Sequence, residues 1–364
     1  MIRVGVIGCG LIAQVMHLPY LQELSDRFKI AALCDLSENV LEACAERYGV
    51  TRTFADWREL LDEPLDAVMV LTPVSHAEPA IEAASKGLNI FVEKPMAFSA
   101  NECESMIEAA DTAEVQLMVG TMKRYDPAYE RLVERLPEIE KLRLVRSTTL
   151  ESPLDPYVEH YPLVKPDGSV PSGPAPGVDA IGEALGPHAD EKTRIIYQSV
   201  LLDCLVHELN MLRGALGEPS AVRYAQLELD RVALDLEFGD VACRVDWVDL
   251  PGIARYRQDL AFYGPDKRLE INLPSPFLRS APSVLVEEGG RVGTADGWRT
   301  EEEIGYDEAF CRELIAFSDA VANGVKTRNP GIDGLRDVLL CQAIVRCHLT
   351  REPVMEPTAT SLAG

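Results

Sequence analysis

The sequence lacks any uninterrupted apolar run long enough to cross a bilayer, so no membrane-spanning helix is expected. It also lacks room for a secretory signal, because Met1-Ile2-Arg3-Val4 leads directly into a strand-like run. The nine cysteines are scattered without a Cys-x-x-Cys pair, which argues against a zinc site and a disulfide framework. We therefore expect cytoplasmic residence, reduced thiols and no bound metal.

Positive charge is scarce in this chain. The 35 Lys and Arg residues face 59 Asp and Glu residues, for a formal net charge of -24. Binding to nucleic acid or to an anionic membrane depends on clustered cations, so neither partner is expected. The composition, with 47% hydrophobic and 26% charged residues, is typical of a globular protein, and 364 residues are enough for two domains.

Residues 1–122 alternate short apolar runs with longer amphipathic ones, which is the pattern of a parallel sheet wrapped by helices. Strands are predicted at residues 3–7, 30–34, 67–71, 89–92 and 116–119. Helices are predicted at residues 36–47, 79–86 and 100–112. This order predicts an α/β fold, with an N-terminal doubly wound Rossmann domain that binds a dinucleotide.

Residues 123–364 have a different pattern of apolar runs and turns. This pattern predicts an α+β domain on an open, mostly antiparallel sheet. Hairpin signals at Phe238-Gly239-Asp240 and Gly264-Pro265-Asp266 separate apolar runs of strand length. Strands are predicted at residues 142–150, 222–229, 232–238, 241–248, 258–263 and 268–273, and closing helices at 307–323 and 332–350. We assign substrate binding and self-association to this domain.

A segment rich in proline and glycine interrupts the second domain at residues 151–190, with eight prolines and five glycines. One interpretation is an exposed linker without fixed structure. The segment also carries Tyr157, His160, Tyr161 and Lys165, which are unlike the small residues of a passive tether. An active-site lid is therefore the alternative.

The first strand is followed by Gly8-Cys9-Gly10-Leu11-Ile12-Ala13, a Gly-x-Gly-x-x-Ala turn at the start of a helix. The glycines allow a tight turn and a close approach of a pyrophosphate, which the helix N-terminus would bind. Asp35 ends the second strand, where its carboxylate would accept hydrogen bonds from the adenosine ribose. Residues 36–39 contain no Arg or Lys to meet a 2′-phosphate, so NAD is preferred over NADP.

Two further segments follow predicted strands and would border the same edge of the sheet. Thr72, Pro73 and His76 come after the third of these strands, and we predict that they contact the cofactor, although a lone histidine more often caps or packs. Glu93-Lys94-Pro95 follows the fourth strand. Lys94 is a candidate catalytic residue rather than a surface lysine, because the proline fixes the backbone beside the predicted nucleotide site.

A predicted helix at residues 193–216 carries Asp203, His207 and Asn210 on one face, because they are four and three residues apart. Spacing alone would equally describe an exposed polar face of an amphipathic helix. A zinc site is a weaker alternative, since one histidine and one carboxylate leave the third ligand missing.

Taken in order, these motifs resemble the glucose-fructose oxidoreductase and inositol dehydrogenase family over nearly the whole chain. The motifs are Gly8-x-Gly10-x-x-Ala13, Glu93-Lys94-Pro95, the segment 120–127 (Gly-Thr-Met-Lys-Arg-Tyr-Asp-Pro) and Asp203-x-x-x-His207-x-x-Asn210. The resemblance implies a dehydrogenase of a sugar, cyclitol or related polyhydroxylated small molecule. It also implies a homodimer or homotetramer.

The resemblance assigns catalysis to Lys94, Asp203 and His207. His207 would be the base, oriented by Asp203, and Lys94 would donate to the reacting oxygen. Arg124, Asn210, Tyr157 and Tyr161 would bind other hydroxyls of the substrate, with Lys94 and His207 at the reacting one. Cofactor contacts are predicted for Gly8, Cys9, Gly10, Leu11, Ile12, Asp35, Thr72, Pro73, His76, Glu93 and Lys94.

Two departures from the family leave the sugar unidentified. The approach to the catalytic helix is Ile195-Ile196-Tyr197-Gln198-Ser199-Val200 instead of a small, glycine-rich run, and the Pro-rich segment before it is long. An enzyme of the same fold that keeps its NAD and oxidises transiently, for epimerisation, elimination or glycoside cleavage, is an alternative. A non-catalytic nucleotide-binding protein is a second alternative.

Overall fold

The computed structural model of the chain describes residues 1–168 and 178–360. It divides into two compact units that are discontinuous in sequence. The first unit is Met1–Thr121, Val158–Ala184 and Phe310–Val338, and the second is Met122–Tyr157, Leu185–Ala309 and Leu339–Gly364. The predicted border at residues 122 and 123 lies beside the first division, while two later segments return to the first unit.

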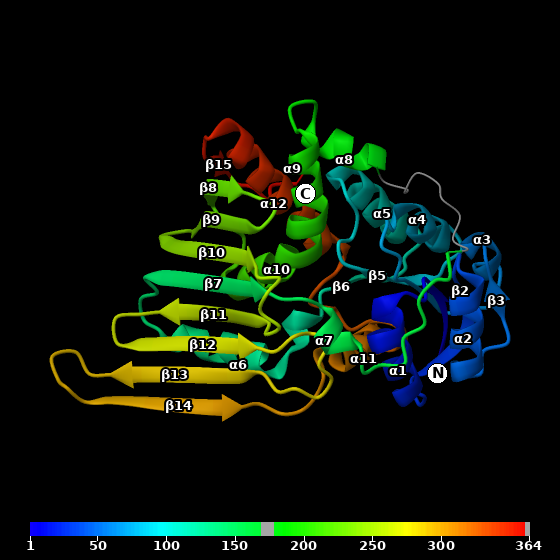
Figure 1. Cartoon of the computed structure of the whole chain (residues 1–364), viewed down its shortest axis with the longest axis horizontal. Helices are drawn as coiled ribbons and strands as arrows, with labels where there is room; N and C mark the ends of the chain where they lie inside the picture. The colour runs from blue at the N-terminus through cyan, green and yellow to red at the C-terminus, as the bar shows by residue number, and fades with distance from the viewer. Residues whose placement is uncertain (169–177, 361–364) are drawn as a thin grey trace. The chain divides into compact units, whose positions relative to one another are not determined.

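The first unit is built on a six-stranded parallel sheet with strand order β3-β2-β1-β4-β5-β6 (Figure 1). Its strands are β1 Ile2–Ile7, β2 Phe28–Cys34, β3 Thr53–Phe54, β4 Ala67–Val70, β5 Asn89–Glu93 and β6 Leu117–Gly120. The order reverses between β1 and β4, as in a Rossmann fold, which confirms the predicted class. The two-residue β3 was not predicted because it is too short to show a periodic pattern.

Helices flank this sheet because its strands are apolar on both faces. They are α1 Leu18–Glu23, α2 Glu38–Tyr48, α3 Trp57–Leu60, α4 Ala77–Ser85, α5 Ala100–Thr112, α8 Val178–Leu185 and α11 Ala309–Asn323. A π-helical turn, Ala13–His17, precedes α1. Ser99 and Glu102 form a reciprocal capping box at the start of α5, which fixes where that helix begins.

The second unit contains a nine-stranded sheet with order β14-β13-β12-β11-β7-β10-β9-β8-β15. Its strands are β7 Leu144–Glu151, β8 Ala221–Leu227, β9 Arg231–Phe238, β10 Val241–Asp249, β11 Arg257–Tyr263, β12 Lys267–Leu273, β13 Val284–Gly290, β14 Gly297–Glu303 and β15 Val354–Met355. Only the pairing of β7 with β10 is parallel among these described strands, so the predicted mostly antiparallel sheet is confirmed.

One face of this sheet is buried and the other is partly exposed. Along β7 the side chains of Val145, Ser147 and Thr149 are buried, while those of Arg146 and Thr148 are not. The second unit also contains α6 Pro127–Arg135, α7 Asp155–Val158, α9 Glu191–Ile196 and α10 Val206–Leu216. The last helix, α12 Gly331–Thr350, starts among residues of the first unit and ends among those of the second.

The helix predicted over residues 193–216 is not uniform. α9 and α10 are separated by a π-helical segment, Tyr197–Leu205. Such a segment takes more residues per turn than an α-helix, so the angle between Asp203 and His207 around the axis differs from the α-helical one, and their sharing a face stays a prediction. Asp203 lies in the π-helical segment and is exposed, whereas His207 in α10 is half-buried and Asn210 is buried.

The segment 151–190 has defined structure in its described parts. Residues 151–157 belong to the second unit, and residues 158–168 extend over the first unit, where α8 follows. Residues 169–177, at the centre of the predicted lid, lie outside the described residues.

Candidate functional site

The glycine-rich turn after β1 has the geometry of an anion-binding turn. Gly8 has φ +95°, and a Cβ built there would lie 3.0 Å from the backbone of Leu71, so only glycine fits. A Cβ built at Gly10 would meet none of the described atoms within 4 Å. The helical turns begin at Leu11 and Ile12. The open backbone at Gly10, before a helix N-terminus, suits a pyrophosphate.

Asp35 ties this turn to the end of β2. Its Oδ2 accepts a hydrogen bond from the backbone N–H of Cys9 at 2.7 Å, and its Oδ1 accepts one from the N–H of Ser37 at 2.8 Å. The carboxylate is half-exposed, and each oxygen has a further lone pair for a ribose hydroxyl. The donor and acceptor set at this edge of the sheet therefore fits a dinucleotide.

His76 is buried, and both of its ring nitrogens face backbone carbonyls. Nδ1 lies 2.9 Å from Pro95 O and Nε2 lies 2.8 Å from Thr72 O. Burial lowers the pKa of His76, and a neutral ring donates to only one of these carbonyls. The ring thus joins the loop after β4, where Pro73 is exposed, to the segment that carries Lys94. Cofactor contact by Thr72, Pro73 and His76 stays a prediction.

Glu93 restrains the backbone of Lys94 through a hydrogen bond. Its carboxylate is 6% exposed, with Oε1 2.6 Å from His17 Nε2 and Oε2 accepting from the Lys94 N–H at 3.0 Å. A Cβ built at Gly120 would lie 3.3 Å from the Glu93 carboxyl carbon, so this glycine leaves room for the carboxylate. Lys94 itself is half-exposed at the end of β5.

A second buried acid lies close to this pair. Glu313 of α11 is fully buried, and its Oε1 accepts from Asn329 Nδ2 at 3.2 Å. Burial, and secondarily the charge of Glu93, raise the pKa of Glu313 well above its ordinary value. The raised pKa means that the interior disfavours the charged form of Glu313. Neither His17 nor Glu313 was predicted, because no local pattern links them to Lys94.

The second unit contains the other predicted catalytic side chains, on the π-helical segment and α10. Glu208, next to His207, points into the unit and is 2% exposed. Its Oε1 accepts from Thr149 Oγ1 at 2.5 Å and from Gln258 Nε2. These bonds fix α10 to β7 and β11, and so determine the orientation in which the helix carries His207.

Lys123 and Gln258 extend this buried network. Lys123 Nζ donates to Gln258 Oε1 at 2.5 Å and lies 3.4 Å from the hydroxyl oxygen of Tyr256. Burial raises the pKa of Tyr256 well above its ordinary value, and nearby carboxylates add to the effect. Burial also raises the pKa of Glu151, with Glu208 adding to the shift and Lys123 opposing it. Lys123 stands in the quoted motif beside Arg124, whereas Tyr256 and Gln258 had no sequence signal.

Two of the predicted substrate residues contact neighbours within the second unit. A Cβ built at Gly214 of α10 would lie 2.7 Å from Arg124 Nε and 2.4 Å from the hydroxyl of Tyr129, so this glycine makes room for both side chains. The Tyr157 hydroxyl accepts from the backbone N–H of Tyr256 at 2.6 Å. Tyr161 belongs to the first unit, with Lys94.

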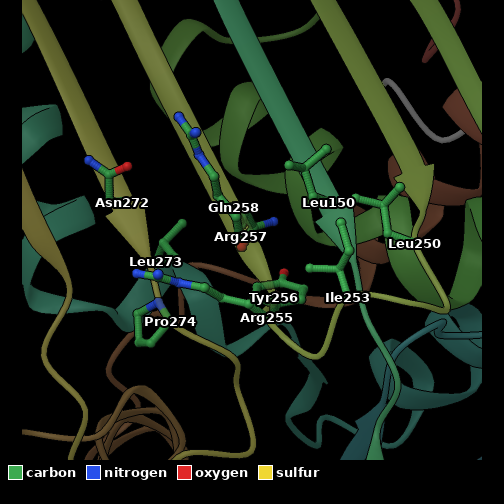
Figure 2. Close-up of a pocket in the computed structure, with 10 residues that line it drawn as sticks. All are labelled: Leu150, Leu250, Ile253, Arg255, Tyr256, Arg257, Gln258, Asn272, Leu273 and Pro274. Atoms are coloured by element: carbon green, nitrogen blue, oxygen red, sulfur yellow. The ribbon is translucent and has the colours of Figure 1, made fainter.

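A pocket of about 660 Å³ lies at the ends of β7, β11 and β12 in the second unit (Figure 2). Tyr256 and Gln258 line it, which connects it with the buried network of Lys123 and Glu208. Figure 2 shows the side chain of Arg255 reaching toward Leu273 and Pro274. The pocket therefore combines apolar walls with hydrogen-bonding groups, as small-molecule sites do.

The described residues include no group of three or more His, Cys, Asp or Glu side chains arranged to hold a metal ion. In the same part of the chain, no helix combines the length and the apolar character needed to cross a membrane.

Comparison with known proteins places these sites in context. Residues 2–121 match the family model described as oxidoreductase family, NAD-binding Rossmann fold. The chain is 26% identical over 355 residues to myo-inositol 2-dehydrogenase of Thermotoga maritima, with 93% of each chain covered. It is 25% identical to scyllo-inositol 2-dehydrogenase (NAD+) of Bacillus subtilis, covering 89% of this chain and 87% of that one.

Solved structures share the whole fold. A structure of levoglucosan dehydrogenase in complex with NADH and levoglucosan superimposes with a TM-score of 0.76 at 20% identity, covering 98% of this chain and 99% of that one. This likeness extends through both units, so it supports the arrangement of a Rossmann sheet followed by a mostly antiparallel sheet.

Proposed function

We propose that the chain is an NAD-dependent dehydrogenase of a sugar or cyclitol, in the glucose-fructose oxidoreductase and inositol dehydrogenase family of oxidoreductases. The observation that carries the proposal is the glycine-rich turn whose Cys9 N–H is bound by Asp35. This turn leaves its backbone open at Gly10 and presents a carboxylate to a ribose. The inositol 2-dehydrogenases among its relatives support a polyhydroxylated substrate oxidised at a secondary carbon.

The nicotinamide, when bound, supplies the hydride acceptor for oxidation or the hydride donor for reduction. During oxidation the hydroxyl proton must leave as the hydride does, and an imidazole nitrogen of His207 accepts it. Lys94 donates a hydrogen bond from its ammonium group to the reacting oxygen and stabilises the negative charge that develops there. Asp203 orients the imidazole, and Arg124, Asn210, Tyr157 and Tyr161 bind the other hydroxyls.

NAD is the preferred cofactor in this proposal. The Asp35 carboxylate accepts hydrogen bonds from free ribose hydroxyls, whereas it would repel a 2′-phosphate. Its two bonds to Cys9 and Ser37 keep it in place at the end of β2. These contacts support a proposal in which the Asp35 carboxylate stays beside the ribose 2′ position, where NAD has a hydroxyl and NADP has a phosphate.

The test is absorbance at the reduced-nicotinamide band, with NAD and a panel of sugars, sugar phosphates, sugar nucleotides and cyclitols. At least one compound should reduce NAD, and Lys94→Met and His207→Ala should each lower turnover by about 100-fold to 10,000-fold. Their NADH affinities should change less than about threefold, a difference below 1 kcal/mol. Lys86→Met, which alters an ion-paired lysine just after α4, is the matched control.

The pH dependence tests the role of the histidine. Alcohol oxidation should become faster as pH rises through the titration of the base, because only neutral imidazole accepts a proton. A His207→Ala enzyme with normal turnover and the same pH limb would remove His207 from the mechanism. Nucleotide that stays bound through gel filtration, with no net NADH formed, would favour the alternative enzyme that keeps its NAD.

A further inference from the structure

Residues Tyr161–Asp167, which we call the strap, contain no helix or strand and contact the first unit through the hydrogen bonds described below. They belong to that unit although they follow the strand β7 of the second unit in sequence. In Figure 1 their green trace passes close to α2, the helix that follows Asp35 and is bonded to the strap. The strap thus brings a distant part of the chain to the predicted nucleotide site.

The first anchor of the strap is Gln14, in the π-helical turn just after the glycine-rich turn. Its Nε2 donates to Val164 O at 2.9 Å, and its Oε1 accepts from the Val164 N–H at 2.9 Å. The same Nε2 donates to Cys9 O at 2.8 Å. One amide side chain, 5% exposed, therefore binds both the strap and the turn proposed to hold the pyrophosphate.

The second set of anchors is on α2. Asn39 Nδ2 donates to Lys165 O at 3.0 Å, and Arg47 donates to Pro162 O at 2.6 Å. Asn39 Oδ1 accepts from Ser37 Oγ at 2.6 Å, and the N–H of Ser37 is bound by Asp35. The strap is thus also connected to the group proposed to bind the ribose.

We propose that the strap is an additional wall of the nucleotide site, and that it slows release of the bound dinucleotide. The inference rests on the proposed function, since it assumes that NAD occupies the turn at Gly8–Gly10. Its physical basis is that the strap is bonded at both places where the nucleotide would be held. Release then requires breaking strap hydrogen bonds, or moving the nucleotide past a wall that those bonds keep in place.

Slow release of the nucleotide has a consequence for the proposed catalytic cycle. A dehydrogenase that exchanges NAD in each turnover is limited by nucleotide release when that step is slow. A strap that slows release therefore favours retention of the nucleotide between turnovers, as in enzymes that oxidise and reduce the same substrate in sequence.

The experiment measures the NADH dissociation rate by stopped-flow fluorescence, with displacement by excess NAD. The double variant Arg47→Met with Val164→Pro removes two bonds of the strap and alters neither the glycine-rich turn nor Asp35. Dissociation should accelerate about tenfold, the effect of one to two lost hydrogen bonds, with the association rate nearly unchanged. Gln14→Leu should accelerate it as well. Arg58→Met, which alters an exposed arginine of α3 bonded to Glu78, is the control and should have no effect.

Hydrogen exchange of the strap, monitored in Gln14→Leu, shows whether it has been released, because the Val164 amide loses its acceptor there. Faster exchange with an unchanged NADH dissociation rate would overturn the proposal. Unchanged exchange would also overturn it, since the strap would then not depend on its anchors. Failure of the unaltered protein to bind any NADH is a separate outcome, which contradicts the proposed function itself.

Discussion

His17 Nε2 lies 2.6 Å from Glu93 Oε1, and this bond joins the first helical turns of the chain to the end of the strand that carries Lys94. His17 is fully buried between the edges of Phe91 and Phe310, with ring centroids 5.5 and 5.6 Å away. The histidine therefore has an apolar environment and one fixed acceptor. Glu93 in turn accepts from the Lys94 N–H, so the pair restricts the backbone that places the ammonium group.

Replacing His17 tests this support. In His17→Phe the aromatic neighbours are retained, but Glu93 loses its donor and a buried acceptor is left unsatisfied. Turnover should fall about tenfold or more through misplacement of Lys94, with the NADH affinity little changed. His17→Gln, which restores an N–H donor, should recover part of the loss. Steady-state kinetics of the two variants measure this loss of turnover. Equal turnover in His17→Phe and the unaltered enzyme would contradict a role of His17 in positioning Lys94.

Glu313 should make the stability of the protein depend on pH. Burial raises its pKa in the folded chain above the ordinary value of 4.5, so above that pH the unfolded chain releases a proton that the folded chain retains. Its contribution to stability is fully present below about pH 4.5 and is lost progressively as the pH rises. Glu313→Gln should thus be more stable than the unaltered protein near pH 8.

The measurement for Glu313→Gln is the urea midpoint between pH 4.5 and 8.5, and the gain should shrink toward the acid end. Glu42→Gln, on the exposed face of α2, is the control and should not change the pH profile. A constant difference at every pH would mean that Glu313 titrates alike in the folded and unfolded chains.

The hydroxyl of Thr149 should stabilise the second unit through Glu208. Thr149→Val keeps the shape of the side chain but removes a donor to a buried carboxylate, a loss of about 1 to 3 kcal/mol in unfolding free energy. Thr148→Val on the partly exposed face of the same strand is the matched control. Chemical denaturation of both variants measures the difference, and similar values for the two would rule out a contribution from the buried bond.

Cofactor choice should follow the charges at the end of β2. Fluorescence titration should give tighter binding for NADH than for NADPH, because the Asp35 carboxylate repels a 2′-phosphate. Asp35→Ser should narrow the difference. The carbonyl of Lys165 is bonded to Asn39, so we expect its ammonium group to attract a 2′-phosphate, and adding Lys165→Ala should widen the difference again. Equal affinities in the unaltered protein would contradict the proposed preference.

The sequence by itself determined the features that depend on neighbouring residues. Apolar runs predicted the strands of the first sheet, because a parallel strand is buried on both faces and needs no alternation. Gly8 and Gly10 predicted the turn, since its positive φ and open backbone suit glycine. Hairpin residues predicted the antiparallel pairs β9 with β10 and β11 with β12.

Weak local signals account for the elements that were missed. β14 is exposed along most of its length and rich in charge, so it has no buried face to produce alternation. The π-helical segment 197–205 has the composition of an ordinary helix, so its residues do not distinguish it from α9 and α10.

Only the tertiary structure decided which distant groups meet. Gln14 and Val164 are 150 residues apart, and Lys123 and Gln258 are 135 apart. Such pairs leave no local pattern, because their partners are set by how strands and helices pack and not by spacing along the chain. The same holds for Glu313 near Glu93: it is buried only in the folded chain, and this burial raises its pKa.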